Sequence, residues 1–131
     1  MLRRRGQLPQ SQPQLSARAD RTHFFLFSAL ILLGSSIPSS SIPSSFILGF
    51  DKIIHFIEYT VFGILGIRSN YKIFNSVNIF ILSFGLVFCV FDELWQSTIP
   101  GRDSSFYDVI ADYSGLIFSL FLYKYIRKII K

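Results

Sequence analysis

The chain has 131 residues, of which 50% are hydrophobic and only 16% are charged. A soluble domain of this size keeps much of its surface wet and carries about 25% charged residues, so a chain with 15 Phe is better suited to lipid. The net charge of +5 by itself allows binding to nucleic acid or to an anionic membrane surface, and the single cysteine, Cys89, excludes an internal disulfide.

Residues 1–21 are polar and contain Arg, Gln, Pro and Ser. A segment with so little to bury is expected to be a disordered, basic cytoplasmic tail. The first apolar run, about residues 22–37, would span about 24 Å as a helix, which is short for a hydrocarbon core of about 30 Å. A cleaved signal peptide is the alternative, but the long polar stretch before the run and the absence of a small-residue cleavage site favour an uncleaved helix.

Three further apolar runs follow, at about residues 50–67, 74–96 and 106–125. A serine-rich loop with Pro43 precedes the first of these runs, and Pro100-Gly101 is a strong turn signal between the last two. No run alternates with the period of two that a membrane β-barrel needs. The sequence therefore predicts an all-α membrane protein, a bundle of four short transmembrane helices forming one domain over residues 22–131.

The basic residues predict the orientation of this bundle, because Lys and Arg in short loops stay on the cytoplasmic side. With a cytoplasmic N-terminus, four spans leave only Lys52 and Arg102 of the 13 basic residues on the outer side, and the C-terminus is cytoplasmic as well. The same bias explains the basic charge without nucleic acid, whose binders gather their charge on one folded face. All of the eight acids except Asp20 map to the outer half, which the rule does not require.

The helix predicted at residues 50–67 begins with a polar face. Asp51 and His55 are four residues apart and therefore share one side of a helix, and Glu58 and Tyr59 continue that side. Glu58 would lie roughly 10 Å below Asp51 along the helix axis. At that depth a carboxylate is expected to face the bundle interior or a water-filled cavity.

The next two predicted helices add matching polar faces. Asp92 and Gln96 are four residues apart near the end of one helix, and Asp108 and Asp112 are four residues apart near the start of the other. Because consecutive helices cross in opposite directions, these positions lie near the same membrane depth as the start of the helix at 50–67. Arg102 is the only arginine near these acids, and it can neutralise them or grip a phosphate or carboxylate.

These polar faces define two groups of candidate site residues. Function is the default interpretation of ionisable groups inside a membrane, so the candidate catalytic residues are His55, Glu58, Asp92, Glu93 and Asp112. The candidate substrate-binding residues are Asp51, Lys52, Tyr59, Gln96, Arg102 and Asp108. Simpler interpretations stay open, since Asp51 and Asp108 can stabilise helix starts and Lys52 can extend to the headgroups. No tight metal-binding motif exists, so no metal ligand is assigned, although the set contains ligand types suited to Mg²⁺, Mn²⁺ or Zn²⁺.

Several of these residues form a recognisable pattern. The pieces are Ser35 and Ser36 with Pro38, then Asp51-Lys52-x-x-His55-x-x-x-Tyr59, then Asp92-Glu93-x-x-Gln96, Pro100-Gly101-Arg102, Asp108 and Gly115. Over roughly residues 22–125 the chain resembles the VanZ-like family of small bacterial membrane proteins. It departs from that family at Asp112 and Ser119, where Asn and Gly are usual. The resemblance implies a cell-envelope role in the bacterial cytoplasmic (inner) membrane, and the member that gives the family its name is linked to teicoplanin resistance.

Three functions are compatible with this resemblance, and it leaves open whether the protein is an enzyme. In the first, an envelope protein binds or modifies a membrane lipid, a lipid-linked precursor or a cell-wall molecule at the outer leaflet. Arg102 and Lys52 would then hold an anionic headgroup, while His55 with Asp51 or Glu58 would act as general acid or base. In the second, a non-catalytic membrane module acts through a partner protein, and in the third, the polar site binds a metal ion or a proton. The sequence identifies no cofactor and no oligomeric state.

Overall fold

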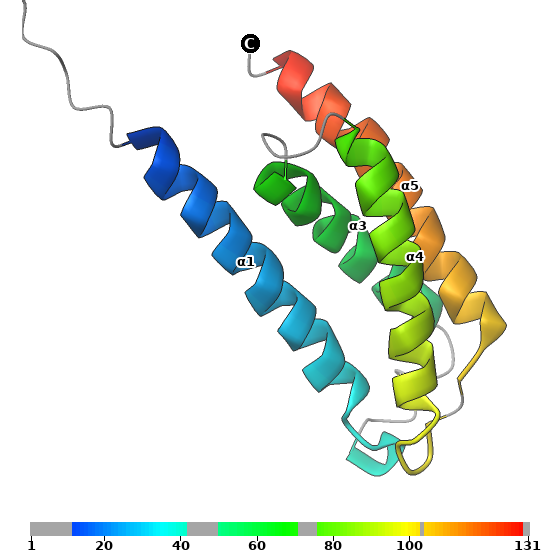
Figure 1. The fold of residues 1–131 in the computed structure, drawn as a ribbon. Coiled ribbons are helices and arrows are strands. Elements are labelled where there is room, and N and C mark those ends of the chain that lie inside the picture. The colour runs from blue at the N-terminus through cyan, green and yellow to red at the C-terminus, as the bar shows by residue number, and fades with distance from the viewer. Residues whose placement is uncertain (1–11, 42–49, 71–75, 103, 130–131) are drawn as a thin grey trace, which may run out of the picture.

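A computed structural model of the chain describes residues 12–41, 50–70, 76–102 and 104–129. These residues form four long helices and a single short 3-10 turn, with no strand among them (Figure 1). The elements are α1 (Gln12–Ser35), η1 (Ser39–Ser41), α3 (Asp51–Asn70), α4 (Val77–Gln96) and α5 (Phe106–Ile129). Consecutive long helices run in opposite directions along the bundle (Figure 1). The prediction of an all-helical chain is confirmed.

The first helix begins earlier than the apolar pattern predicts. α1 starts at Gln12, so residues 12–21, expected in the disordered tail, are helical in the structure, while residues 1–11 lie outside the described part of the chain. Ala, Arg, Gln and Leu in this stretch are strong helix formers, and Pro is tolerated in a first helical turn. Arg68 at the end of α3 holds this segment, with its Nη2 2.7 Å from Asp20 Oδ1. The helix therefore continues beyond its apolar part.

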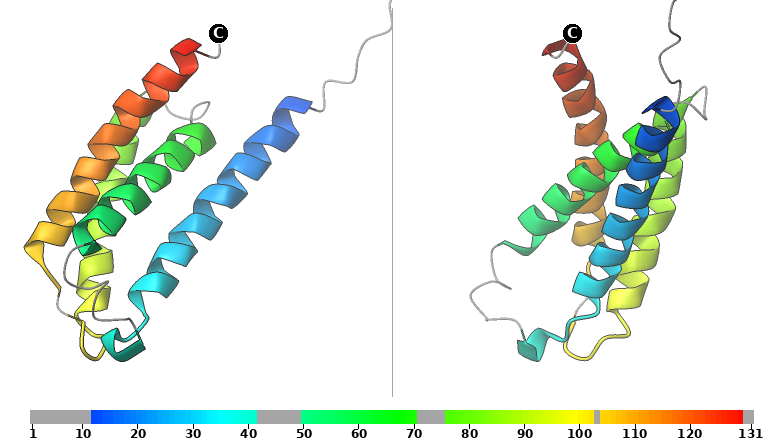
Figure 2. Two further views of the ribbon diagram at one scale, coloured as in Figure 1. Left: turned by 180° about the vertical axis from the view of Figure 1, so that it is seen from behind. Right: turned by 90° about the vertical axis from the view of Figure 1, so that its left-hand side faces the viewer.

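α3 is the central helix of the bundle. It lies between α1 and α5 (Figure 2) and has its most extensive contacts with α5. Phe62 of α3 stacks on Phe88 of α4 with ring centroids 4.9 Å apart. Phe24 of α1 contacts the ring of Phe62 with a centroid distance of 4.9 Å. Tyr59, Phe62 and Leu116 are fully buried. These aromatic contacts join α1 and α4 to α3.

Small residues allow the backbones of α3 and α5 to touch. A Cβ atom added at Gly115 would meet the backbone carbonyl oxygen of Phe56, and one added at Gly63 would meet the hydroxyl of Ser119. Such close approach is a common basis of helix association in membranes. It fixes the position of α5 against α3 just beyond the polar face of α3.

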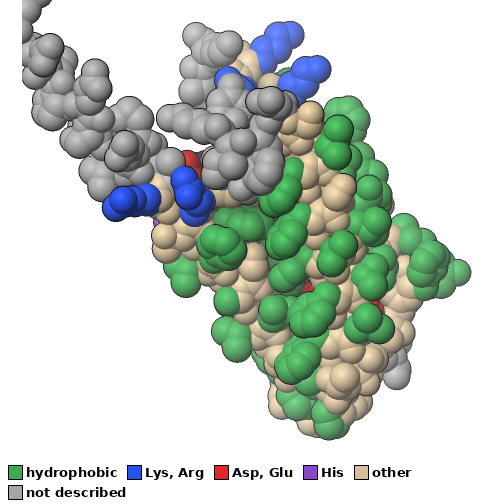
Figure 3. Space-filling view, in the orientation of Figure 1, with side chains coloured by type: hydrophobic (Ala, Val, Ile, Leu, Met, Phe, Trp, Pro, Cys, Tyr) green, Lys and Arg blue, Asp and Glu red, His purple; other side chains and the backbone are tan. Residues whose placement is uncertain are grey.

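The outer surface of the helices is largely apolar. Large hydrophobic side chains are exposed on every helix (Figure 3), including Leu26, Ile57, Val87 and Phe121. Two of the described helices, α4 and α5, are long and apolar enough to cross a membrane. α3 carries charged residues at both ends and at Glu58, which lowers its hydropathy. Crossing by all four helices and a cytoplasmic location of both termini stay predictions.

Candidate functional site

Most of the candidate site residues meet at one end of the bundle. α3 and α5 begin at this end, and α4 ends there. The antiparallel arrangement therefore brings the first turns of two helices against the last turn of a third. Six polar side chains from these turns are each at most 5% exposed: His55, Asp92, Glu93, Gln96, Asp108 and Asp112. We refer to these six residues as the polar cluster.

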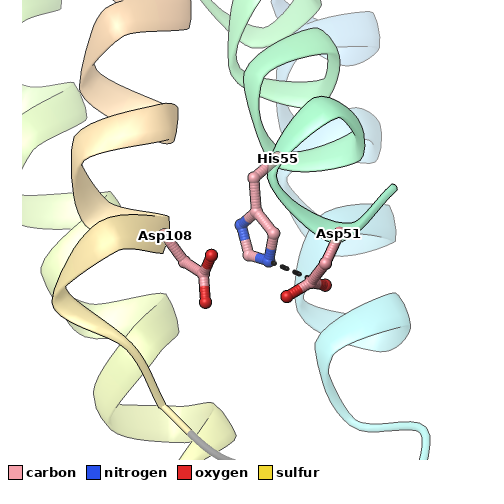
Figure 4. A group of neighbouring side chains, drawn as sticks. All are labelled: Asp51, His55 and Asp108. Atoms are coloured by element: carbon pink, nitrogen blue, oxygen red, sulfur yellow. Dashed lines mark ion pairs between the residues drawn. The ribbon is translucent and has the colours of Figure 1, made fainter. Parts of the chain in front are cut away.

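His55 lies at the centre of this cluster between carboxylates. Its Nδ1 is 2.9 Å from Oδ1 of Asp112, and the two side chains are 6% and 0% exposed. Its Nε2 is 3.9 Å from Oδ1 of Asp51, one turn earlier on α3. Figure 4 shows the imidazole between Asp51 and Asp108, which approach it from α3 and α5. A carboxylate beside an imidazole fixes its orientation and favours its protonated form, so His55 is equipped to exchange a proton.

Lys52 and Asp108 form an ion pair across the same two helices. Lys52 Nζ donates to Asp108 Oδ1 over 2.7 Å, and the lysine side chain is 55% exposed whereas that of Asp108 is 4% exposed. Lys52 thus presents part of its ammonium group outward while holding a buried carboxylate. The cap of α5 is supplied instead by Ser105, whose hydroxyl accepts the backbone N–H of Tyr107 at 3.2 Å.

The consecutive acids of α4 have different partners. Asp92 Oδ2 accepts a hydrogen bond from the hydroxyl of buried Tyr59 at 3.2 Å. Glu93 Oε2 accepts one from the backbone N–H of Ser105 at 3.0 Å. Asp92 is therefore linked to α3, and Glu93 is linked to the segment that begins α5.

Two serines at the end of α1 close the remaining side of the cluster. Gln96 Nε2 donates to Ser35 Oγ at 3.2 Å, and Trp95 Nε1 donates to Ser36 Oγ at 2.8 Å. Sequence reasoning assigned no site role to Ser35 or to Ser105. The preference of serine for the position before a helix could have identified Ser105, whereas Ser35 depends on how α1 packs against α4.

Two predicted site residues lie at the margin of the cluster. Glu58 is half-buried further along α3. Arg102 is half-buried, and its Nη2 donates to the backbone carbonyl of Gly34 at 3.3 Å. Arg102 makes no ion pair with an acid in the described ranges. The structure therefore does not show Arg102 neutralising the acids by direct contact. Asp103, the acid that follows Arg102 in the sequence, lies outside those ranges.

Among the described residues, two sets of side chains in and beside the cluster have ligand atoms close enough for a metal ion. Within each set the ligand atoms lie within 4.8 Å of one another. One set consists of Asp51, His55 and Asp108, and the other of His55, Glu93 and Asp112. The sequence assigned no metal ligand because the residues come from separate helices, without the short spacing of a metal motif.

Comparison with known proteins gives a family but no individual relative. The family model described as VanZ/LLP1 matches residues 5–128, a range that includes the whole polar cluster and all four long helices except the last residue of α5. No curated protein and no solved structure matches the chain.

Proposed function

Because the chain belongs to the VanZ/LLP1 family, we propose that it is a multi-pass protein of the bacterial inner membrane that binds or modifies a lipid-linked or cell-wall molecule. Its polar cluster faces the non-cytoplasmic side, and both termini are cytoplasmic. Through this site the protein alters susceptibility to glycopeptides such as teicoplanin.

The packing of the helices supports crossing by the whole bundle. α4 and α5 are long and apolar enough to cross a membrane, and α3 has its main contacts with α5. If α5 crosses, α3 crosses beside it, because its buried His55 and its Lys52 both pair with acids of α5. Lipid then covers the large apolar side chains on the outer surface. The positive-inside rule directs the basic end, with Arg68 and Lys128, to the cytoplasm.

The observation that carries the proposal is the buried His55–Asp112 pair with its 2.9 Å contact. Taking charged groups out of water costs several kcal/mol per ion. The attraction between the two charges offsets about this much free energy and little more. Stability alone therefore gives little reason to keep such a pair in the bundle. A histidine oriented by a carboxylate can remove or donate a proton in a reaction at a bound headgroup.

The mouth of the site is suited to an anionic headgroup. Lys52 is half-exposed while it holds Asp108, so its remaining hydrogens can donate to a phosphate or carboxylate from outside. Asp51 is 37% exposed beside it. A headgroup bound by Lys52 would therefore lie close to His55.

The test replaces His55 and compares it with the other histidine of the chain. Cells lacking the protein are complemented with wild type, His55→Ala or His23→Ala. His23 is exposed and belongs to the opposite end of the bundle, which makes it a matched control. The measurements are glycopeptide susceptibility and the mass-spectrometric profile of lipids and peptidoglycan precursors. We expect His55→Ala to behave like the deletion and His23→Ala like wild type, with equal amounts in the membrane. Full complementation by His55→Ala would contradict the proposal.

The same experiment distinguishes an enzyme from a module that acts through a partner protein. An enzyme changes the precursor or lipid profile when it is removed. A module leaves the profile unchanged while drug binding to the cells changes.

A further inference from the structure

Three carboxylate oxygens of the polar cluster are buried without a hydrogen-bond partner in the described part of the chain: Asp92 Oδ1, Glu93 Oε1 and Asp112 Oδ2. Glu93 and Asp112 also have ligand atoms close to those of His55. The two residues are 5% and 0% exposed. Their other oxygens are occupied, since Glu93 Oε2 accepts the Ser105 N–H and Asp112 Oδ1 contacts His55 Nδ1. An unpaired carboxylate oxygen in a protein interior is costly. The unpaired oxygens of Glu93 and Asp112 therefore point to a bound partner.

The two carboxylates converge on one imidazole. Ligand atoms of His55, Glu93 and Asp112 all lie within 4.8 Å of one another, and the three residues are buried. In a tetrahedral zinc site with bonds of about 2.0–2.2 Å, two ligand atoms lie about 3.3–3.6 Å apart. Side-chain movements that shorten the separations by at most about 1.5 Å would therefore bring all three ligand atoms onto one ion. We infer that His55, Glu93 and Asp112 bind a divalent transition-metal ion, Zn²⁺ or Mn²⁺.

The surrounding charges favour a cation at this point. The nearest lysine, Lys52, is engaged by Asp108 at 2.7 Å. Arg102 donates to a backbone carbonyl of α1. Neither basic side chain is therefore in direct contact with Glu93 or Asp112. A divalent ion neutralises both carboxylates at once and supplies the partner that their second oxygens lack.

The ligand types narrow the choice of ion. Mg²⁺ and Ca²⁺ prefer oxygen ligands only, whereas an imidazole nitrogen suits Zn²⁺ and other transition metals. A metal-binding histidine usually directs its other ring nitrogen to a carboxylate, and Asp51 lies 3.9 Å from Nε2 of His55. Three protein ligands leave a coordination position open, as in catalytic zinc sites. Binding of a phosphate-bearing headgroup at that open position rests on the proposed function. The ion site itself does not depend on the proposed function.

The neighbouring set, Asp51 with His55 and Asp108, is the less favourable site. Asp108 Oδ1 already accepts from the Lys52 ammonium at 2.7 Å, so an ion would have to displace a bound cation. Asp51 is 37% exposed and can be hydrated. Both sets contain His55, which Figure 4 shows with the two acids of the neighbouring set. Replacement of the acids, rather than of His55, therefore distinguishes the two sets.

The experiment measures metal content in the full-length protein, purified in detergent. Wild type and variants are loaded with Zn²⁺ or with Mn²⁺, dialysed against metal-free buffer and analysed by mass spectrometry for metal per chain. The variants are Glu93→Gln and Asp112→Asn in the inferred site, Asp108→Asn in the neighbouring set, and Asp20→Asn at the opposite end. Only monodisperse protein is compared. Glu93→Gln keeps an oxygen for the Ser105 N–H, so it is the variant that retains the fold if Asp112→Asn does not.

We expect wild type to retain a single ion per chain, and Glu93→Gln and Asp112→Asn to bind it more than about tenfold more weakly. Asp108→Asn and Asp20→Asn should retain it. The ion should also raise the melting temperature of wild type but not of Glu93→Gln, because a ligand stabilises only the state that binds it. The inference is overturned if wild type retains neither metal, if Glu93→Gln binds as tightly as wild type, or if Asp108→Asn alone loses the ion. Metal content is measured without substrate, so these outcomes do not depend on the envelope phenotype.

Discussion

The two ends of the bundle use charged side chains in opposite ways. At the end with the polar cluster, acids and an imidazole are buried and pair across helices, as in His55 with Asp112. At the other end the basic side chains are exposed, among them Arg18, Arg21, Lys124 and Lys128 (Figure 3). A cavity of about 590 Å³ at that end is lined by apolar side chains together with Lys124, Arg127 and Lys128.

The difference between these ends lies in burial rather than in the number of charges. The Arg68–Asp20 contact at the basic end is 2.7 Å long, but the arginine is 51% exposed. Exposed ion pairs of this kind stabilise a protein by about 0–1 kcal/mol. A buried pair is expensive to form and expensive to break. The basic end is thus suited to anchoring at a membrane surface, and the acidic end to binding a specific ligand.

The contrast between the two ends requires that they lie on opposite sides of the membrane. We expect Ser97→Cys, an exposed position beside the polar cluster, to react in intact cells with a maleimide that cannot cross the membrane. Lys128→Cys should react only after the membrane is opened. Wild type is the blank, because its only cysteine, Cys89, is buried. Equal labelling of both variants in intact cells would contradict the membrane topology on which the proposed function depends.

The largest effect on stability is expected from breaking the buried His55–Asp112 pair. Asp112→Ala leaves His55 without its partner, and breaking a buried ion pair costs about 3–5 kcal/mol. The measurement is the free energy of unfolding in mixed micelles, followed by the fluorescence of Trp95. Asp112→Asn, which keeps a hydrogen-bonding oxygen, should lose clearly less. A loss as small as that of an exposed acid would mean that the pair is not desolvated.

A smaller loss is expected where α3 and α5 touch. In Gly115→Ala the new methyl group meets the Phe56 carbonyl, and such overpacking costs about 1–3 kcal/mol. Gly34→Ala is the matched control, because a Cβ added at Gly34 meets nothing within 4 Å. Removal of a helical glycine there should leave stability unchanged or raise it by about 0.5–1 kcal/mol. Equal behaviour of the two variants would show that close approach at Gly115 does not set the helix spacing.

The smallest effect is expected at the basic end. Asp20→Ala removes the partner of Arg68, which is largely exposed, and should lower the free energy of unfolding by less than about 1 kcal/mol. Raising the salt concentration should reduce even this difference, because exposed charges are screened. A loss as large as that of Asp112→Ala would mean that burial does not distinguish the two ends.

Most of the polar cluster could be identified from the sequence. The spacing of Asp51 from His55 and of Asp108 from Asp112 places each pair on one helical face, and this spacing is a property of a single helix. The alternation of helix direction then brings the faces to one end. Burial of six predicted residues there agrees with this reasoning: His55, Asp92, Glu93, Gln96, Asp108 and Asp112.

The pairing of these residues could not be predicted in the same way. The sequence offered Asp51 or Glu58 as the partner of His55. Asp51 does lie 3.9 Å from Nε2 of the imidazole, but the shorter contact, 2.9 Å at Nδ1, is with Asp112. It offered Arg102 as a group that neutralises the acids, whereas its guanidinium donates to the Gly34 carbonyl. A contact between helices depends on the rotation of each helix about its axis, and residue spacing carries no information about that rotation.

The sequence by itself determined that this chain is helical, that its surface is suited to lipid and that its acids and basic residues separate to opposite ends. Those features follow from local propensity, apolar run length and charge position, which each segment carries alone. Only the tertiary structure decided that His55, Glu93 and Asp112 share one buried point. That convergence depends on how closely α3 and α5 approach at Gly115, a distance that three-dimensional packing sets.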